Sequence, residues 1–555
     1  MIRQFGIKLS VLVSNFKIYV MKCVLVFLLI GLTYTSVAQL PTLNWGELEN
    51  SYAMKGIVGG SDEHFYVQES SMSNSVFKVY DYKAKLVSSM DLINEYNGQK
   101  LSVAKTMKFH NKDIMILAAV DNKSDSFSYY SMEIKDGKVS DELIKLCSVP
   151  YKLKSFYFGN TTNFNMDYEG IRLSRDKESI IIVMGHSAVD SKKENEKFTV
   201  IRINKNLEVD YQKEVVIDFP DDDFTVDDVE VSSNGKLIVL GKKHKERKEI
   251  KEEIKENRAD REKGEKNKII LYDFYIYTES GEGFEGEKFV LEGESVPLRS
   301  VLFPLSDGNM IMTGFYAQTN NNVIGARGTY FATLDKEGNP ISKSLTPFTH
   351  DFFDSIEERH FPMILKKIQK DKYKGLSVFN NIRYISLNEN TKEVKFVSEV
   401  AYSYEKVIRN SDGSSSLSTH YFAGDVLITN YTLDGDLAWS TRLEKWYHTN
   451  KKSFLGLLLK ENKGSLYFIF NNLKSKEERK AMGVKKSENP VVEMGVISPT
   501  GTKEHREVLY IPNKEDDRIK LLPVSSDISE NGYAILRFAR SMTMKKSKLA
   551  TFKAW

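Results

Sequence analysis

The densest acidic stretch of the 555-residue sequence lies between residues 218 and 230, where seven Asp or Glu side chains crowd together. Calcium prefers several carboxylate oxygens as ligands. Asp221, Asp223 and Asp227 are therefore the candidate metal ligands, with Ca²⁺ as the candidate ion. The stretch lacks the spacing of an EF-hand loop and is not repeated along the chain. The alternative is a polar loop that leads into an exposed strand edge.

A second candidate group is aromatic. Trp446 and Tyr447 are adjacent in the sequence, with Trp439 and His448 close by. Flat aromatic rings can stack on a sugar or a peptide, so Trp446 and Tyr447 are the candidate ligand-stacking residues. The same residue types pack the sheets of β-rich folds, and core packing is the alternative.

The sequence contains no motif that identifies a catalytic centre. Its nine histidines show no HExxH or clustered spacing, and no nucleophile elbow, Walker loop or dinucleotide fingerprint is present. We therefore name no catalytic residue and no organic cofactor. Sites assembled from distant loops leave no such motif, so an enzyme is not excluded.

The cysteine content indicates a fold that is stabilised by its hydrophobic core and not by disulfide bonds. Cys23 falls within the first 38 residues, which leaves Cys147 alone in the rest of the chain. One cysteine cannot form an intrachain disulfide. Because Cys147 stands at the end of an apolar strand pattern, we expect a buried and unreactive thiol.

The first residues have the pattern of an export signal. Met21 and Lys22 precede a short apolar run, and Ser36-Val37-Ala38 has the small residues that a signal peptidase requires. The apolar run is too short to span a bilayer. Residues 1–38 are thus expected to be a leader and secretory signal peptide, with the mature protein exported to the periplasm or cell envelope. An uncleaved anchor is the alternative, and translation starting at Met21 is also open.

The charge of the chain gives no reason to expect nucleic acid as a partner. Four of its basic residues lie within residues 1–38, so the formal net charge of +3 becomes about −1 for the remainder. Residues 242–268 form a charged insertion with 12 Lys or Arg against 8 Asp or Glu. Mixed signs dilute its field, which favours a solvated hairpin extension over a contact with an anionic surface.

Beyond residue 50 the apolar residues alternate with a period of two, which indicates strands. Polar turns of two kinds divide these strands, and both kinds contain residues that tolerate positive φ. The first kind precedes a β-rich run and occurs at residues 61–63, 111–113, 175–177, 233–235, 306–308, 411–413, 462–464 and 530–532. The second kind closes a strand further along and occurs at residues 80–83, 134–137, 203–206, 277–281, 334–338, 387–390, 433–436 and 497–501.

Two hairpins per unit make a four-stranded antiparallel sheet, and tandem sheets of this kind form a β-propeller. Stacking the sheets radially buries faces that a single sheet would expose. We therefore predict an all-β fold in which residues 39–555 form one β-propeller of four-stranded antiparallel blades, with eight favoured and seven to nine possible. The last half unit, residues 519–552, is expected to take a strand from residues 40–48. A pair of β-sandwiches is the alternative.

Two segments resemble a known class of protein. These are residues 312–331, which include Met312-Thr313-Gly314-Phe315, and residues 424–439, which include Leu433-Asp434-Gly435-Asp436. They resemble exported β-propeller-like proteins of Bacteroidota-type bacteria. The resemblance implies an exported repeat protein and supplies no catalytic residue. Residues 433–439 also look like one blade of a quinoprotein propeller, but the pattern does not recur and no quinone cofactor is implied.

Two main functions fit these features. The favoured one is an exported, non-enzymatic binding or scaffold protein of the cell envelope, whose partner is an envelope protein or a glycan bound where loops converge. The alternative is an exported hydrolase or lyase acting on polysaccharide or peptide in the central funnel. A calcium-stabilised lectin-like module is a third, weaker interpretation.

Overall fold

The structure is a computed structural model that describes residues 42–555 with several gaps. The residues outside the description are 1–41, 51–53, 71–74, 94, 122–125, 151–169, 187–190, 233–234, 247, 253–271, 282, 294, 319–324, 349–375, 378–379, 410–413, 485–488, 513–518 and 541–545. The predicted signal peptide therefore lies outside the described residues. The chain divides into residues 1–43 and residues 44–555, and the fold below is that of the second unit.

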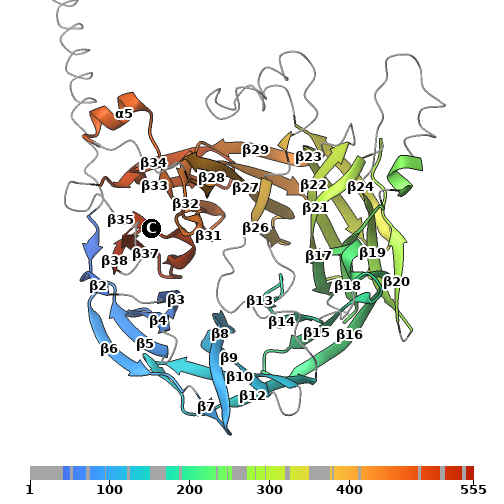
Figure 1. The fold of residues 1–555 in the computed structure, drawn as a ribbon, viewed down its shortest axis with the longest axis horizontal. Coiled ribbons are helices and arrows are strands. Elements are labelled where there is room, and N and C mark those ends of the chain that lie inside the picture. The colour runs from blue at the N-terminus through green and yellow to red at the C-terminus, as the bar shows by residue number, and fades with distance from the viewer. Residues whose placement is uncertain are drawn as a thin grey trace, which may run out of the picture. The chain divides into compact units, whose positions relative to one another are not determined.

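Residues 44–555 form an eight-bladed β-propeller of antiparallel sheets (Figure 1). The first blade contains β3 (Met54–Gly60), β4 (His64–Ser70), β5 (Ser75–Asp81) and β6 (Leu86–Asp91). The second contains β7 (Glu95–Tyr96), β8 (Gln99–Phe109), β9 (Lys112–Asp121), β10 (Ser126–Lys135), β11 (Lys138–Val139) and β12 (Ile144–Pro150). The third contains β13 (Gly170–Leu173), β14 (Ile180–Gly185), β15 (Asn195–Ile203) and β16 (Val209–Pro220).

The fourth blade contains β17 (Phe224–Val231), β18 (Leu237–His244), β19 (Tyr272–Ser280) and β20 (Gly283–Lys288). The fifth contains β21 (Ser295–Pro304), β22 (Met310–Gln318), β23 (Gly325–Leu334), β24 (Pro340–Pro347) and β25 (Leu376–Ser377). The sixth contains β26 (Asn380–Asn388), β27 (Glu393–Arg409), β28 (Ser415–Thr432), β29 (Leu437–Leu443) and β30 (Tyr447–Thr449).

The seventh blade contains β31 (Leu458–Asn462), β32 (Ser465–Asn472), β33 (Val491–Ile497) and β34 (Lys503–Tyr510). The eighth contains β1 (Asn44–Trp45), β2 (Glu49–Asn50), β35 (Ile519–Leu521), β36 (Asp527–Ile528), β37 (Tyr533–Arg540) and β38 (Lys546–Lys553). Short helical turns accompany the strands: η1 (Asp221–Asp223), η2 (Lys452–Phe454), α5 (Lys476–Ala481) and η3 (Pro523–Ser525). None of the helices in the described part of the chain is long and apolar enough to span a membrane.

The predicted fold class and the favoured number of blades are confirmed. Two of the turns that we assigned to different repeat units, however, lie in the same blade. The turn at residues 387–390 joins β26 to β27, the first two strands of the sixth blade. Residues 411–413 lie outside the described residues, and in the sequence they fall between β27 and β28, strands two and three of the same blade. These turns therefore belong to one unit instead of two. The eighth blade is the half unit at the C-terminus, completed by the segment near residue 44.

Both ends of the described chain contribute to the eighth blade. Asn44 and Trp45 pair with Thr551 and Ala550 of β38, so the predicted closure by a strand from residues 40–48 is confirmed. In Figure 1, blue β2 lies beside red β38. Glu49 of β2 also accepts hydrogen bonds from Lys78 Nζ at 2.7 Å and the Tyr80 hydroxyl at 2.9 Å in the first blade. The closing segment thus ties the eighth blade to the first.

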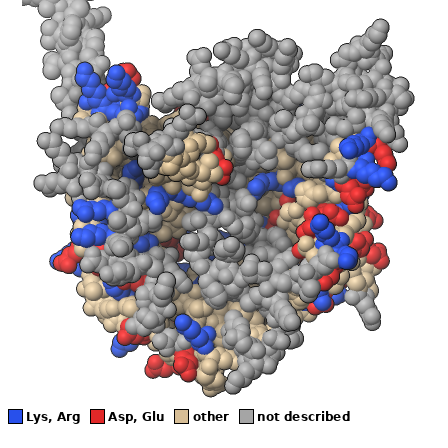
Figure 2. All heavy atoms as spheres, viewed as in Figure 1, with Lys and Arg blue, Asp and Glu red and all other residues tan. Residues whose placement is uncertain are grey.

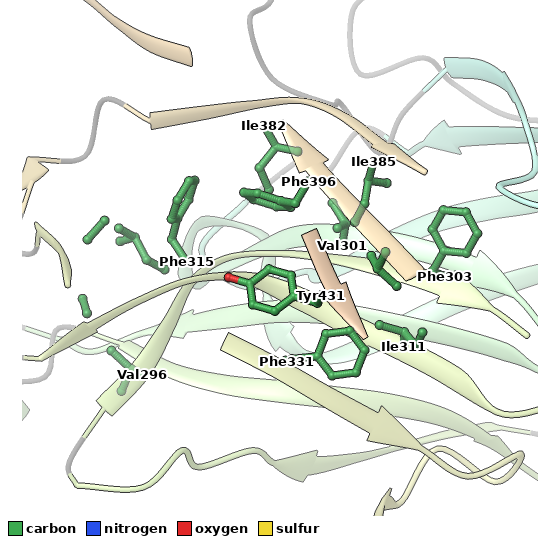
Figure 3. Close-up of a cluster of buried hydrophobic side chains, with 14 of the residues drawn as sticks. Val296, Val301, Phe303, Ile311, Phe315, Phe331, Ile382, Ile385, Phe396 and Tyr431 are labelled. Atoms are coloured by element: carbon green, nitrogen blue, oxygen red, sulfur yellow. The ribbon is translucent and has the colours of Figure 1, made fainter. Parts of the chain in front are cut away.

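Apolar side chains from neighbouring blades fill the space between the sheets. Between the fifth and sixth blades, Phe315 and Phe331 meet Phe396 and Tyr431 (Figure 3). The rings of Phe315 and Phe396 have centroids 5.2 Å apart and an interplanar angle of 80°. An edge-to-face pair of this kind adds about 0.5–1.5 kcal/mol to the gain from burial. Such contacts give each sheet the partner that it needs to bury its faces.

The two ends of the blades differ in the length of their connections. Short turns join the first strand to the second and the third to the fourth in most blades. The four longest intervals between described strands each join the second strand of a blade to the third or one blade to the next, so the strand ends that flank them lie at the other end. The four intervals are residues 151–169, 245–271, 348–375 and 473–490. The predicted charged insertion 242–268 begins within β18 and falls mainly in the second of these, most of it outside the described residues. We refer to this end as the long-connection end.

Candidate functional site

The acidic candidates for a metal site are not brought together. Asp221 and Asp223 lie on the short turn η1, whereas Asp227 lies on β17 and pairs with Lys242 Nζ at 2.5 Å. In the described ranges, no three His, Cys, Asp or Glu side chains lie close enough to hold a metal ion. The calcium site remains a prediction without a described ligand group. The alternative of an exposed strand edge is wrong, because β17 is the first strand of its blade and is mostly buried.

The last acids of that stretch are part of a buried ion-pair network instead. Glu230 is fully buried, and its Oε2 lies 2.9 Å from Arg172 Nη1. Asp228 is 2% exposed and pairs with Arg175 Nη2 at 2.8 Å. Asp228 also accepts the backbone N–H of Leu302 at 2.8 Å. These bonds join the third, fourth and fifth blades, and a buried charge is tolerated only with such partners.

The first strands of several blades contain register shifts beside charged residues. These shifts fall at Val103/Lys105 of β8, Val226/Asp228 of β17, Pro297/Arg299 of β21 and Ile382/Tyr384 of β26. A bulge re-aims the side chains beside it. Lys105 is exposed to solvent, yet the surrounding protein lowers the pKa of its ammonium through desolvation.

The aromatic candidates lie on β30 and its approach, and their side chains point to opposite faces. The register pairs Phe422 of β28 with His448 and Ala423 with Tyr447. Tyr447 is 1% exposed and packs against Phe454, Leu455 and Leu522 in the core. The core-packing alternative is therefore correct for Tyr447. Trp446 is half-buried and remains the candidate for stacking on a ligand.

The face opposite to Tyr447 carries a row of four rings, which we name the aromatic row: His420, Phe422, Trp446 and His448. The Phe422 and Trp446 centroids are 4.4 Å apart, with the rings tilted by 59°. His420 Nδ1 lies 3.0 Å from His448 Nε2. Phe422 is buried, while the other three are half-buried. The row combines apolar ring faces with imidazole nitrogens, which suits a ligand having both an apolar face and polar groups.

The backbone beneath the aromatic row is held by hydrogen bonds to the seventh blade. The Trp446 N–H donates to Asn472 Oδ1 at 2.9 Å, and the Trp446 carbonyl accepts from the Leu473 N–H at 2.6 Å. Asn472 Nδ2 in turn donates to Glu493 Oε2 at 2.8 Å. Glu493 is buried and pairs with Arg506 and Lys474. A ligand would therefore meet a surface that is already ordered.

A second buried group fixes the residue just before the row. The Lys445 ammonium pairs with Glu399, which also pairs with Arg383, and Lys445 Nζ donates to the Gly456 carbonyl at 2.7 Å. Burial by itself would raise the pKa of Glu399, but the two cationic partners hold that pKa below its ordinary value. The carboxylate is thus ionised and keeps Lys445 in place beside Trp446.

The described surface carries charges of both signs, and the cysteine lies beneath it. In the coloured part of the face in Figure 2, Lys and Arg are interspersed with Asp and Glu.

Cys147 is 6% exposed, and burial raises the pKa of its thiol to about 12. The prediction of a buried cysteine is confirmed, and a thiol with this pKa is a poor nucleophile.

Comparisons with known proteins establish no family for the chain. The sequence matches no protein-family model and no curated protein. A structure from a study of two prolyl endopeptidases has a TM-score of 0.36 and 9% identity, covering 89% of this chain and 55% of that one. Oligogalacturonate lyase in complex with manganese gives 0.33 and 9%, covering 89% and 98%. An uncharacterised Listeria monocytogenes protein gives 0.33 and 9%, covering 90% and 94%.

These similarities carry no argument about the activity of the chain. The chain spans about half the length of the prolyl endopeptidase and of prolyl oligopeptidase B from Galerina marginata, which it covers by 55% each. Identity this low reports on the fold alone, and one fold serves many functions. The function has to be argued from the side chains of the site itself.

Proposed function

We propose that this protein is exported to the cell envelope and acts there as a binding protein, holding a glycan on the aromatic row. The observation that carries the proposal is the row itself, in which Trp446, His420 and His448 stand half-buried around Phe422. Ring faces stack on the apolar faces of sugars, and imidazole nitrogens can bond to hydroxyl groups. Export is supported by the sequence pattern of residues 1–38.

The position of the row also supports a binding role. The row lies where β27 and β28 extend beyond the pairing of β26 with β27, and β30 is the strand that pairs with this extension. Both features are at the long-connection end. Binding residues are often carried by loops on a rigid scaffold. The buried pairs around Lys445 and Asn472 supply that rigidity.

The proposal is tested by titrating the purified protein with soluble peptidoglycan fragments and measuring binding by isothermal titration calorimetry. We expect Trp446→Ala to weaken binding by about 5-fold to 150-fold, because a lost stacking contact costs roughly 1–3 kcal/mol. Trp439→Phe is the matched control. The Trp439 ring packs on the turn at Gly501, and its Nε1 donates to the Pro499 carbonyl at 3.1 Å, away from the row. Equal affinity of the Trp446→Ala variant and the unaltered protein would contradict the proposal.

A second candidate is an exported hydrolase or lyase acting on polysaccharide or peptide near the propeller axis. Lys105 favours it, because this exposed lysine lies beside the register shift in β8, the first strand of its blade, and desolvation lowers the pKa of its ammonium. Charged groups near a funnel can serve acid–base chemistry. Release of new chain ends from polysaccharide or peptide by the purified protein would support this candidate over simple binding.

A further inference from the structure

The histidine pair of the aromatic row has a geometry that ligand stacking does not require. His420 lies on β28 and His448 on β30, 28 residues apart in the sequence. Their ring planes are parallel within 1°, and the centroids are 5.0 Å apart. The nitrogens Nδ1 of His420 and Nε2 of His448 face each other at 3.0 Å. Two imidazole nitrogens from half-buried side chains therefore lie within 3.0 Å of each other.

We propose that His420 and His448 together bind one divalent transition-metal ion. Metal–nitrogen bonds to imidazole are about 2.0–2.1 Å long, so two nitrogens around one ion lie about 2.9 Å apart at the right angle of square-planar Cu²⁺ and about 3.3–3.4 Å apart at the tetrahedral angle of Zn²⁺. The observed separation of 3.0 Å is within the tolerance of such a site. Binding of the ion requires each ring to rotate about its Cβ–Cγ bond until both lone pairs point toward it. This inference goes beyond the proposed binding of a glycan and does not rest on it.

The ligand set selects the class of metal. Neutral imidazole suits Zn²⁺, Cu²⁺ and Ni²⁺, whereas Ca²⁺ and Mg²⁺ require oxygen ligands. The described residues place no third His, Cys, Asp or Glu in a metal-binding group with these two histidines. The ion would therefore keep coordination positions for water or for donor atoms of a bound molecule. This is the arrangement of an open site and not of a closed structural one.

The supporting strands hold the two ligands in place. Phe422 pairs with His448 in the β28–β30 register, and β30 is anchored on its other face by the buried side chains of Tyr447 and Thr449. Phe422 and Trp446 supply an apolar wall beside the nitrogens. A preformed pair loses little conformational entropy when it binds an ion, and an apolar surround strengthens the bond. A direct N–H···N hydrogen bond also fits 3.0 Å, so the experiment must separate the two.

The experiment uses the full chain without a histidine tag, stripped with a chelator and titrated with Cu²⁺ and, separately, with Zn²⁺. We expect one equivalent of each to bind by calorimetry, and the Cu²⁺ electron paramagnetic resonance spectrum to show hyperfine splitting from two nitrogens. His420→Ala and His448→Phe should each weaken that binding by at least about tenfold, since loss of a ligand exceeds the loss of a supporting contact. The Phe variant keeps an aromatic ring in the row and so guards against misfolding.

His505→Ala is the matched control, because His505 is an exposed histidine on β34 whose Nε2 lies 3.2 Å from Glu507. It should leave the stoichiometry and the affinity unchanged. Circular dichroism of each variant verifies the fold. Metal uptake by the unaltered protein that equals uptake by the His420→Ala/His448→Phe double variant overturns the proposal. Loss of metal binding in the His505→Ala variant would also overturn it. In either case the two histidines would form only a hydrogen-bonded pair.

Discussion

Lys177 occupies a left-handed turn position, with φ at 65°, that glycine fills in the equivalent turn of the next blade. In both turns the N–H of this residue donates to the carbonyl of the serine three residues earlier at 2.9 Å, Ser174 for Lys177 and Ser232 for Gly235. Related turns recur at Asp81, Asn204, Asp335 and Ser498, whose side-chain oxygens accept backbone N–H groups two and four residues later. This repeated turn is the sequence pattern from which the blades can be predicted.

Exchanging the residue types at these two positions should change stability in opposite directions. Lys177→Gly relieves the left-handed strain and should raise the free energy of unfolding by about 0.5–1 kcal/mol. Gly235→Ala should lower it by about 1 kcal/mol. The Gly235 site has open space, with Arg202 Nη2 at 4.0 Å as the nearest group, so the cost is one of backbone alone. Urea unfolding measures both changes, and the same sign for both would refute the assignment.

The contact between β9 and β3 should make the stability of the fold depend on pH. Asp113 of β9 lies against Gly59 of β3, where a Cβ atom would come within 3.0 Å of Asp113 Oδ1. Burial raises the pKa of Asp113 to about 6, and the Lys108 charge opposes the shift only in part. Because the folded state holds the proton more tightly than the unfolded chain, stability falls as pH rises from about 4 to about 6.

Asp113→Asn removes the ionisation and keeps the shape of the side chain. We expect the variant to be about 1–2 kcal/mol more stable than the unaltered protein at pH 7, with the advantage disappearing near pH 4. Denaturant unfolding at the two pH values measures the difference. An equal gain at both values would show that packing, and not the buried charge, is the cause.

The elements could be predicted from the sequence as far as their signals are local. Turn chemistry and two-residue alternation are local, and they suffice for the strands, the antiparallel blades and the closing segment. The limits of the sixth blade could not be predicted in this way, because β27 and β28 continue as an extended hairpin whose alternation looks like that of an additional unit. Sites depend on pairings across long separations. No sequence pattern predicts that Arg172 contacts Glu230 or that His420 contacts His448. The side chains of Tyr447 and Trp446 alternate between faces, but the register of β30 was needed to show which of the two faces the core.

The segment at residues 44–50 pairs with β38 and so closes the ring of blades. The packing of this segment therefore determines how easily the eighth blade unfolds. Trp45 is its main apolar contact, with its ring centroid 5.0 Å from that of Phe538 and 5.4 Å from that of Tyr510. Lys548 Nζ lies 4.6 Å over the same ring. Without this packing, β38 would have an unpaired edge, and the first and eighth blades would lose a shared strand segment.

Trp45→Ala should lower the free energy of unfolding by about 2 kcal/mol, less than for a fully buried tryptophan because Trp45 is half-buried. The loss should be local at first, so hydrogen exchange should accelerate in β37 and β38 while β22 and β23 keep their protection. Ile341→Ala, at a residue 60% exposed on β24, is the control and should change stability by no more than about 0.5 kcal/mol. Faster exchange spread evenly over all blades would instead mean that the propeller opens as one cooperative unit, with no weak point at its closing blade.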